Sequence, residues 1–114
     1  MASCLFCKII AGEIPSTRVY EDDQLVVITD ISPQAPLHCL VIPRKHIPTL
    51  NELTEEDTGL VGEMVRRASM TAREHGHGDE GYRTVFNCNA GAGQSVFHIH
   101  LHLLAGRRFT WPPG

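Results

Sequence analysis

Residues 97–104 read Phe-His-Ile-His-Leu-His-Leu-Leu, so three histidines alternate with apolar residues. Successive side chains of a β-strand point to opposite faces, and this period of two therefore predicts a strand. Four apolar residues of the stretch are expected to face the core: Phe97, Ile99, Leu101 and Leu103. His98, His100 and His102 are expected to share the other face, with neighbours about 6.6 Å apart along the chain.

A row of imidazoles is a candidate active site, because imidazole acts near neutral pH as nucleophile, proton carrier or metal ligand. Two chemistries are open. In the first, two or three of the histidines share a catalytic zinc. In the second, His100 attacks a phosphorus atom while its neighbours supply protons and hydrogen bonds. No carboxylate in the local sequence would orient the imidazoles as metal ligands, which favours the nucleophile.

A glycine-rich loop, residues 89–95 (Asn-Ala-Gly-Ala-Gly-Gln-Ser), leads into the row. It precedes a strand rather than joining a strand to a helix, so it is not a dinucleotide fingerprint. Glycines let backbone N–H groups approach an anion closely, and Ser95 adds a hydroxyl donor. The loop is either a plain hairpin turn or one wall of a phosphate-sized anion site, and the adjacent histidines favour the anion site.

Cys4 and Cys7 form a Cys-x-x-Cys pair within a short predicted helix, residues 4–11. A redox dithiol is expected near a strand–helix boundary in a βαβ pattern, which this sequence lacks. A zinc half-site needs a second pair of ligands elsewhere in the chain. Taken alone, the pair leaves both interpretations open.

The remaining pattern predicts further strands and one long helix. The strands are expected at residues 18–20, 25–28, 38–43 and 82–87. The helix begins after Thr54, which serves as its cap, has acidic residues in its first turn, and ends at Gly76.

Length and composition suit one domain, residues 1–114, with 42% apolar and 20% charged residues. The formal net charge of −3 offers no general basic surface for nucleic acid. No signal peptide and no apolar run of membrane-spanning length are visible, so we expect a cytoplasmic protein without membrane contact. In that compartment the four cysteines are expected to be thiols or metal ligands.

Residues 98–104 resemble the His-φ-His-φ-His-φ-φ signature of the histidine triad superfamily. Stretches along nearly the whole chain resemble its Hint branch: 6–10, 14–15, 30–36, His38, 41–43, 45–46, 93–96 and 111–114. The branch comprises purine nucleotide-binding hydrolases that cleave phosphorus–nitrogen bonds in nucleoside phosphoramidates such as adenosine monophosphoramidate. The resemblance implies an α+β fold, with an antiparallel sheet of about five strands, one long helix and a short N-terminal helix, and a homodimer.

The resemblance also implies roles for individual residues. His100 is the nucleophile that forms a nucleotidyl-imidazole intermediate, His102 binds the phosphate, and His38 orients the nucleophile by a hydrogen bond. Asp30 holds the ribose hydroxyls with Ile31 packed beside it. The phosphate and leaving-group side is lined by four further residues: Asn87, Gly93, Gln94 and Ser95.

Bacterial members of the family often carry a structural zinc, and this chain matches that pattern at Cys4, Cys7, His46 and His98. One zinc per chain is therefore expected, and His98 would serve the metal rather than catalysis. Two other functions stay open: a nucleotide-binding regulatory module with incidental turnover, and a hydrolase of dinucleoside polyphosphates. The tail, residues 111–114 (Trp-Pro-Pro-Gly), favours the Hint branch, and we expect Trp111 to reach the active site of the partner in the dimer.

Overall fold

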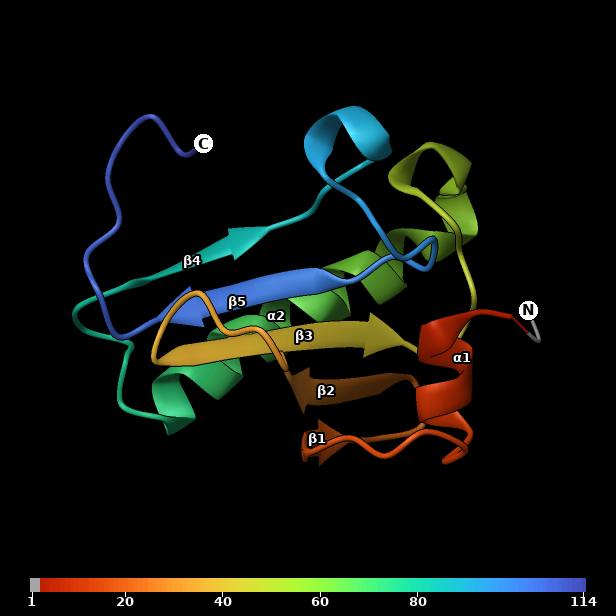
Figure 1. Ribbon diagram of the computed structural model, residues 1–114, viewed down its shortest axis with the longest axis horizontal. Coiled ribbons are helices and arrows are strands. Elements are labelled where there is room, and N and C mark those ends of the chain that lie inside the picture. The colour runs from red at the N-terminus through yellow and green to blue at the C-terminus, as the bar shows by residue number, and fades with distance from the viewer. Residues whose placement is uncertain (1–2) are drawn as a thin grey trace.

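The computed structural model describes residues 3–114, so residues 1 and 2 of the predicted single domain lie outside the described part. Its centre is one antiparallel sheet of five strands in the order β1-β2-β3-β5-β4 (Figure 1). The strands are β1 (Arg18–Glu21), β2 (Leu25–Thr29), β3 (Leu37–Pro43), β4 (Tyr82–Val85) and β5 (Leu101–Ala105). The helices are α1 (Leu5–Ile10) and α2 (Thr58–Glu74). The predicted α+β fold is confirmed.

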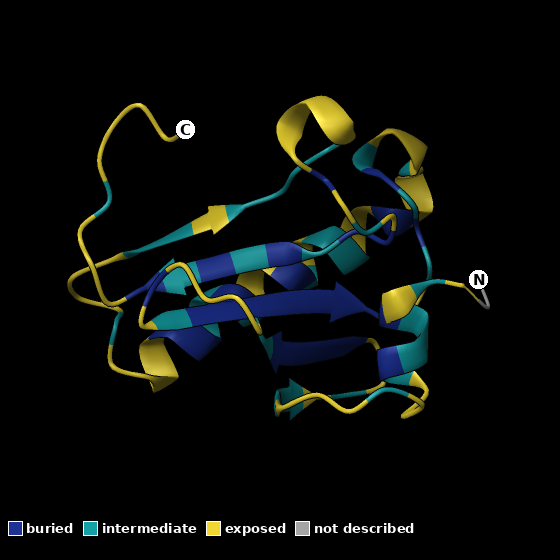
Figure 2. Cartoon of the chain, in the orientation of Figure 1, coloured by how far each residue is buried: buried dark blue, intermediate teal, exposed yellow. Residues whose placement is uncertain are grey.

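The central strands β2 and β3 are buried on both faces, as the dark ribbons of Figure 2 show. Because side chains alternate along a strand, β3 contributes to two apolar clusters at once. Cys39 and Val41 join the cluster under α2. Leu40 and Ile42 join a second cluster, on the opposite face, that includes residues of α1. The two helices therefore cover opposite faces of the sheet.

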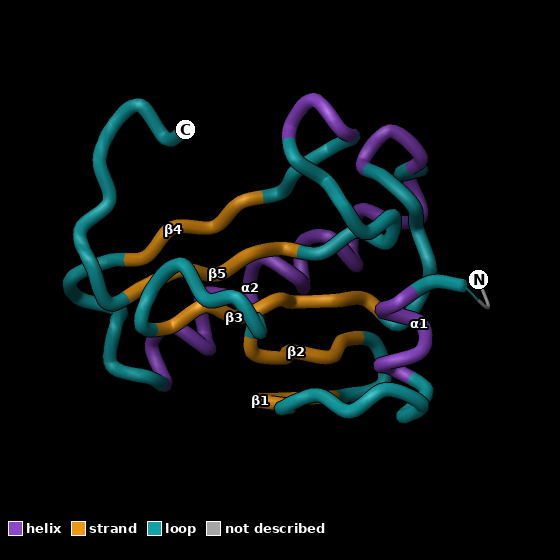
Figure 3. The backbone as a smooth tube through the Cα atoms, in the orientation of Figure 1, coloured by secondary structure: helices purple, strands orange, loops and turns teal. Residues whose placement is uncertain are grey.

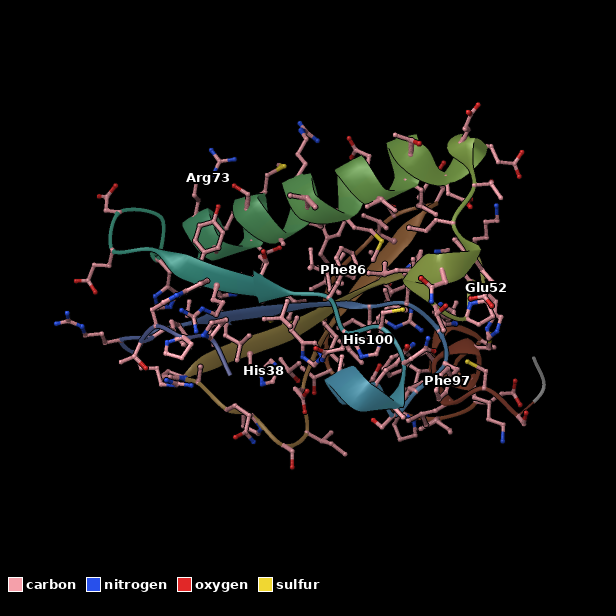
Figure 4. The ribbon with its side chains drawn as sticks, turned by 90° about the horizontal axis from the view of Figure 1, so that it is seen from above. His38, Glu52, Arg73, Phe86, Phe97 and His100 are labelled. Atoms are coloured by element: carbon pink, nitrogen blue, oxygen red, sulfur yellow. The ribbon has the colours of Figure 1, made fainter. Side chains whose placement is uncertain are left out.

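α2 packs on the sheet through one apolar stripe, with Met64, Ala68 and Ala72 fully buried. The predicted helix starts too early, because residues 55–57 form a separate 3-10 turn before α2. A capping box between Thr54 and Asp57 fixes this turn. Figure 4 shows α2 on one side of the sheet, with His38 and His100 on the other.

The predicted histidine strand is shorter than expected, because β5 begins only at Leu101. Pairing with β3 ends at the Val41–Leu101 pair, and beyond it the Ile99 N–H donates to the carbonyl of Ile47 in a loop, at 2.8 Å. Residues 97–100 are therefore not paired with β3, and their side chains do not alternate between the two faces of the sheet as those of a strand would. The prediction that Phe97 faces the core is consequently wrong, since Phe97 is 47% exposed.

Other boundaries differ from the prediction by one or two residues. The strand expected over residues 82–87 ends at Val85, and the helix expected over residues 4–11 spans Leu5–Ile10. Among residues 3–114, no helix combines the length and the apolar character needed to cross a membrane.

Candidate active site and metal cluster

His100 lies just before β5, and its backbone neighbourhood fixes its tautomer. Its Nδ1 is 2.8 Å from the carbonyl oxygen of His98. A carbonyl oxygen only accepts, so Nδ1 carries the proton and donates it, which leaves the lone pair on Nε2. Burial lowers the pKa of His100, although the His98 carbonyl and the charge of Asp30 oppose that effect. The residue is therefore a neutral imidazole with a free Nε2, the form that attacks an electrophile.

His38 and His102 form a hydrogen-bonded pair on the same face of the sheet. The backbone N–H of Gln34 donates to His38 Nδ1 at 3.0 Å, which places the proton of His38 on Nε2. That Nε2 lies 2.9 Å from His102 Nδ1, so His38 donates and His102 keeps its own proton on Nε2. The carboxylate of Asp30 stands beside the pair, with Oδ2 at 3.4 Å from His38 Nε2.

Both rings of this pair favour the neutral state in the free protein. Burial lowers the pKa of His38, and the neighbouring Asp30 acts in the opposite direction. Burial also lowers the pKa of His102, to about 4, with further lowering from the charges of His100 and His38. His102 therefore presents a neutral N–H donor next to His100, whose ring centroid lies 5.1 Å away.

The expectation that His38 bonds to the nucleophile is wrong in its detail. His38 bonds to His102, and His100 is held by the His98 carbonyl instead. The strand register explains this. Leu40 is paired with His102, which makes His38 a diagonal neighbour of His102 on the same face. His100 lies beyond the paired part of β5, out of reach of β3 pairing.

A pocket of about 630 Å³ opens in front of His100 and His102, a size typical of small-molecule sites. Five of the predicted site residues line it: Asp30, Ile31, Ser95, His100 and His102. Ile31 is fully exposed at its rim. The pocket also has an apolar lining: Leu5, Phe6, Ile9, Ile14, Ile28 and Leu40. The lining combines polar and apolar side chains, which suits a ligand that carries both an anionic group and a flat ring.

Gln94 shapes the glycine-rich loop from within. Its side chain is buried, and its Oε1 accepts from the backbone N–H of Asn89 at 2.7 Å. Its Nε2 donates to the carbonyls of Pro48 and Val96, at 2.8 and 3.1 Å. With both ends of its amide occupied by the backbone, this side chain braces the loop.

The other residues predicted on the phosphate side differ in whether they line the pocket. Figure 3 shows the loop and a short helical turn, Ala90–Ala92, between β4 and β5. Ser95 lines the pocket, whereas Asn87 and Gly93 are not among its lining residues in the described chain. Gly93 has a φ of +91°, a conformation that glycine adopts without strain.

Phe6 is a pocket residue that the sequence reasoning missed. Its ring is 4% exposed and stands edge-on to His100, with centroids 4.9 Å apart and planes at 84°. It meets His98 in the same manner at 6.0 Å. The signal was present as apolar residues at helical spacing, Phe6 and Ile9, which mark one buried face of α1.

Cys4, Cys7, His46 and His98 converge into one cluster, with one ligand atom of each lying within 4.8 Å of all the others. His98 Nδ1 lies 3.5 Å from Cys4 Sγ and 3.6 Å from Cys7 Sγ. His46 Nδ1 lies 3.4 Å from Cys7 Sγ and 3.2 Å from His98 Nδ1. Metal bonds of about 2.0–2.3 Å in tetrahedral geometry separate the ligand atoms by about 3.3–3.8 Å, so the spacing fits.

His98 is also oriented as a ligand. It is fully buried, and its Nε2 lies 2.7 Å from the carbonyl oxygen of Pro43. Nε2 therefore donates its proton there, and the lone pair of Nδ1 faces the cluster, as in metal sites whose histidines are held by a backbone carbonyl. These four residues could bind a metal ion. His98 therefore belongs to this cluster and is not grouped with His100 and His102.

The chain is similar to known proteins over nearly its whole length. The chain matches the family model described as scavenger mRNA decapping enzyme C-term binding over residues 3–109. It is 48% identical to the purine nucleoside phosphoramidase of Escherichia coli over 103 residues, covering 90% of this chain and 87% of that protein.

Solved structures share the whole fold. A HIT family hydrolase from Legionella pneumophila is 54% identical, with a TM-score of 0.96 over 98% of this chain and 100% of that one. A zinc-bound histidine triad family protein from Mycobacterium smegmatis is 35% identical, with a TM-score of 0.81 over 99% of this chain and 81% of that one. The likeness therefore includes the sheet, both helices and the connections that carry the histidines.

Proposed function

Because the chain belongs to the histidine triad (HIT) family of hydrolases, we propose that it hydrolyses phosphorus–nitrogen bonds in purine nucleoside phosphoramidates. The observation that carries this proposal is the state of His100. Its Nδ1–H is held by the His98 carbonyl, so the lone pair is left on Nε2, and His100 lines the pocket. The relative from Escherichia coli, a purine nucleoside phosphoramidase, supports this substrate class.

The pocket suggests how the substrate is held. The purine packs on the apolar wall that includes Phe6 and Ile9, and the phosphoryl group lies before His100 and His102 with Ser95 as a further donor. Asp30 serves the ribose hydroxyls. Its Oδ1 already accepts from the Ser32 N–H at 2.8 Å, which fixes the carboxylate and leaves Oδ2 as an acceptor.

In the chemical step, Nε2 of His100 attacks phosphorus, and the bond from phosphorus to the leaving nitrogen breaks. The nitrogen departs as an amine and needs a proton. The negative phosphoryl oxygens raise the pKa of His102 when the substrate binds, so the His102–His38 pair takes up a proton and delivers it to the amine. Water then hydrolyses the nucleotidyl-imidazole, which releases the nucleoside monophosphate and restores His100.

A substrate panel tests the proposal and separates it from two rivals. We expect adenosine monophosphoramidate to be hydrolysed with a kcat/KM far above that of diadenosine polyphosphates. The reverse order would identify a dinucleoside polyphosphate hydrolase. Tight binding of AMP with negligible turnover of every compound would identify a regulatory module.

The cluster of Cys4, Cys7, His46 and His98 is proposed to hold one structural zinc per chain. Two thiolates and two imidazoles form a closed tetrahedral donor set of the kind that structural zinc prefers. The zinc-bound relative from Mycobacterium smegmatis supports the choice of metal. The ligands come from α1, from the loop after β3 and from the segment before β5, so the ion would join three distant parts of a small core.

We further propose a homodimer in which Trp111 approaches the partner's active site. Trp111 is 82% exposed, and a large aromatic on a tail usually needs a surface to cover it. The tail before it is fixed, since Arg83 donates to the carbonyl of Thr110 at 3.0 Å. In this proposal the partners are purine nucleoside monophosphates and phosphoramidates and a second copy of the chain, without nucleic acid or membrane, and a cytoplasmic location remains a prediction.

A further inference from the structure

α1 carries two sets of residues with different partners. Cys4, its N-cap, and Cys7 belong to the metal cluster. Leu5, Phe6 and Ile9 line the pocket. The two sets are interleaved along the N-cap and the six-residue helix, so a movement of the cysteines also moves the pocket wall.

The position of α1 depends on the packing of Phe6 and Ile9 in the apolar cluster on that face of the sheet, and on contacts at its two ends. An isolated helix of this length is unstable in water. At the C-terminal end, Arg18 Nη2 donates to the carbonyls of Ile9 and Ile10, at 2.8 and 3.2 Å. At the N-terminal end, α1 is held through the cysteine–histidine cluster, in which Cys4 Sγ lies 3.5 Å from His98 Nδ1. Thiol–imidazole contacts of this kind are weak, whereas bonds to a shared metal ion would hold the end firmly.

The cluster is also adjacent to the nucleophile. His98 supplies its ring to the cluster and its carbonyl to Nδ1 of His100. The Phe6 ring, two residues after Cys4, packs edge-on against His100. Phe6 in the pocket wall thus directly precedes the cluster residue Cys7, and the nucleophile lies two residues after the cluster residue His98.

We propose that the metal ion in this cluster sets the affinity of the pocket for the nucleotide base, by holding α1 as its wall. Cys4 and Cys7 then act as positioning residues for nucleotide binding, in addition to any role in stability. This inference rests on the proposed function, because it takes a purine as the group that packs on the wall. If loss of the metal leaves the docked position of α1 populated at about one tenth, the apparent Kd for the nucleotide rises about tenfold.

The test compares zinc-loaded full-length chain, the same protein stripped with a chelator, and the stripped protein after zinc is returned. Calorimetry measures the Kd for AMP and for ribose phosphate, which lacks the base. We expect stripping to raise the Kd for AMP about tenfold, to leave that for ribose phosphate nearly unchanged, and to be reversed by zinc. Hydrogen exchange of the α1 amides should become faster, with little change in α2.

Two variants keep the test independent of general stability. His46→Ala removes a ligand that lies outside the pocket lining, and it takes the place of the stripped protein if stripping unfolds the chain. Met64→Ala destabilises the core under α2 without touching the cluster, and at a temperature where it stays folded it should bind AMP normally.

The outcomes separate the inference from the function on which it rests. Equal Kd values for AMP with and without zinc, together with unchanged α1 exchange, would refute the inference alone. Failure of the zinc-loaded protein to bind AMP would refute the proposed function, and α1 exchange would still report whether the metal holds the helix.

Discussion

Acidification should destabilise this protein through His102. Burial and the neighbouring histidines lower the pKa of His102 in the folded chain from 6.5 to about 4. An unfolded chain takes up this proton below pH 6.5, whereas the folded chain resists it until about pH 4. Stability is therefore fully present above the unfolded pKa, and it falls as the pH drops from 6.5 toward 4.

The size of the effect follows from the pKa difference. Between about pH 7.5 and about pH 5, the single group removes up to about 2 kcal/mol from the free energy of unfolding. Urea unfolding of the wild type and of His102→Gln at both pH values isolates this contribution, because the other titrating groups are common to both proteins. The wild type should lose up to about 2 kcal/mol more than the variant.

A control variant and a clear contrary result complete the test. His75→Gln replaces an exposed histidine at the end of α2 and should retain the full pH dependence of the wild type. If His102→Gln loses as much stability on acidification as the wild type does, His102 is not held neutral by the fold, and the tautomer assignment of the His38–His102 pair fails with it.

The metal and the tail give two further predictions. Wild-type chain should contain about one zinc by metal analysis. The double variant Cys4→Ser with Cys7→Ser should lose the metal and unfold at a lower thermal midpoint. Full zinc retention by this double variant would refute the ligand assignment. Deleting residues 110–114 should change the preference among phosphoramidates with different leaving groups. A monomeric mass at micromolar concentration, or unchanged preference after the deletion, would refute the proposed role of Trp111.

Much of the fold follows from local patterns in the sequence. Alternation in residues 38–43 identifies a strand close to its observed position. Helical spacing with a cap at Thr54 does the same for the long helix. These signals are local, since each depends on how a few successive side chains divide between core and solvent. The spacing of Cys4 and Cys7 alone leaves a redox pair and a zinc half-site open, whereas the tertiary fold brings His46 and His98 beside them.

The parts that were wrong depend on contacts between distant residues. Strand alternation over residues 97–104 does not reveal that β3 stops pairing at Val41, so it placed Phe97 in the core. It also does not reveal the diagonal register that joins His38 to His102. Gln94 could face a ligand or its own backbone, and only the positions of the surrounding carbonyls decide that.

The covalent intermediate on His100 is the most direct test of the account. Rapid quench of the enzyme with radiolabelled adenosine phosphoramidate, followed by mass analysis of the trapped peptide, should show an adenylate on His100 of the wild type. His100→Ala should show no adduct and almost no turnover, yet still bind AMP, while His102→Ala should form the adduct more slowly. An adduct on the His100→Ala protein, or turnover within a few fold of the wild type, would show that another residue is the nucleophile. No adduct in any protein, with activity lost to a chelator, would instead indicate a metal-hydroxide mechanism.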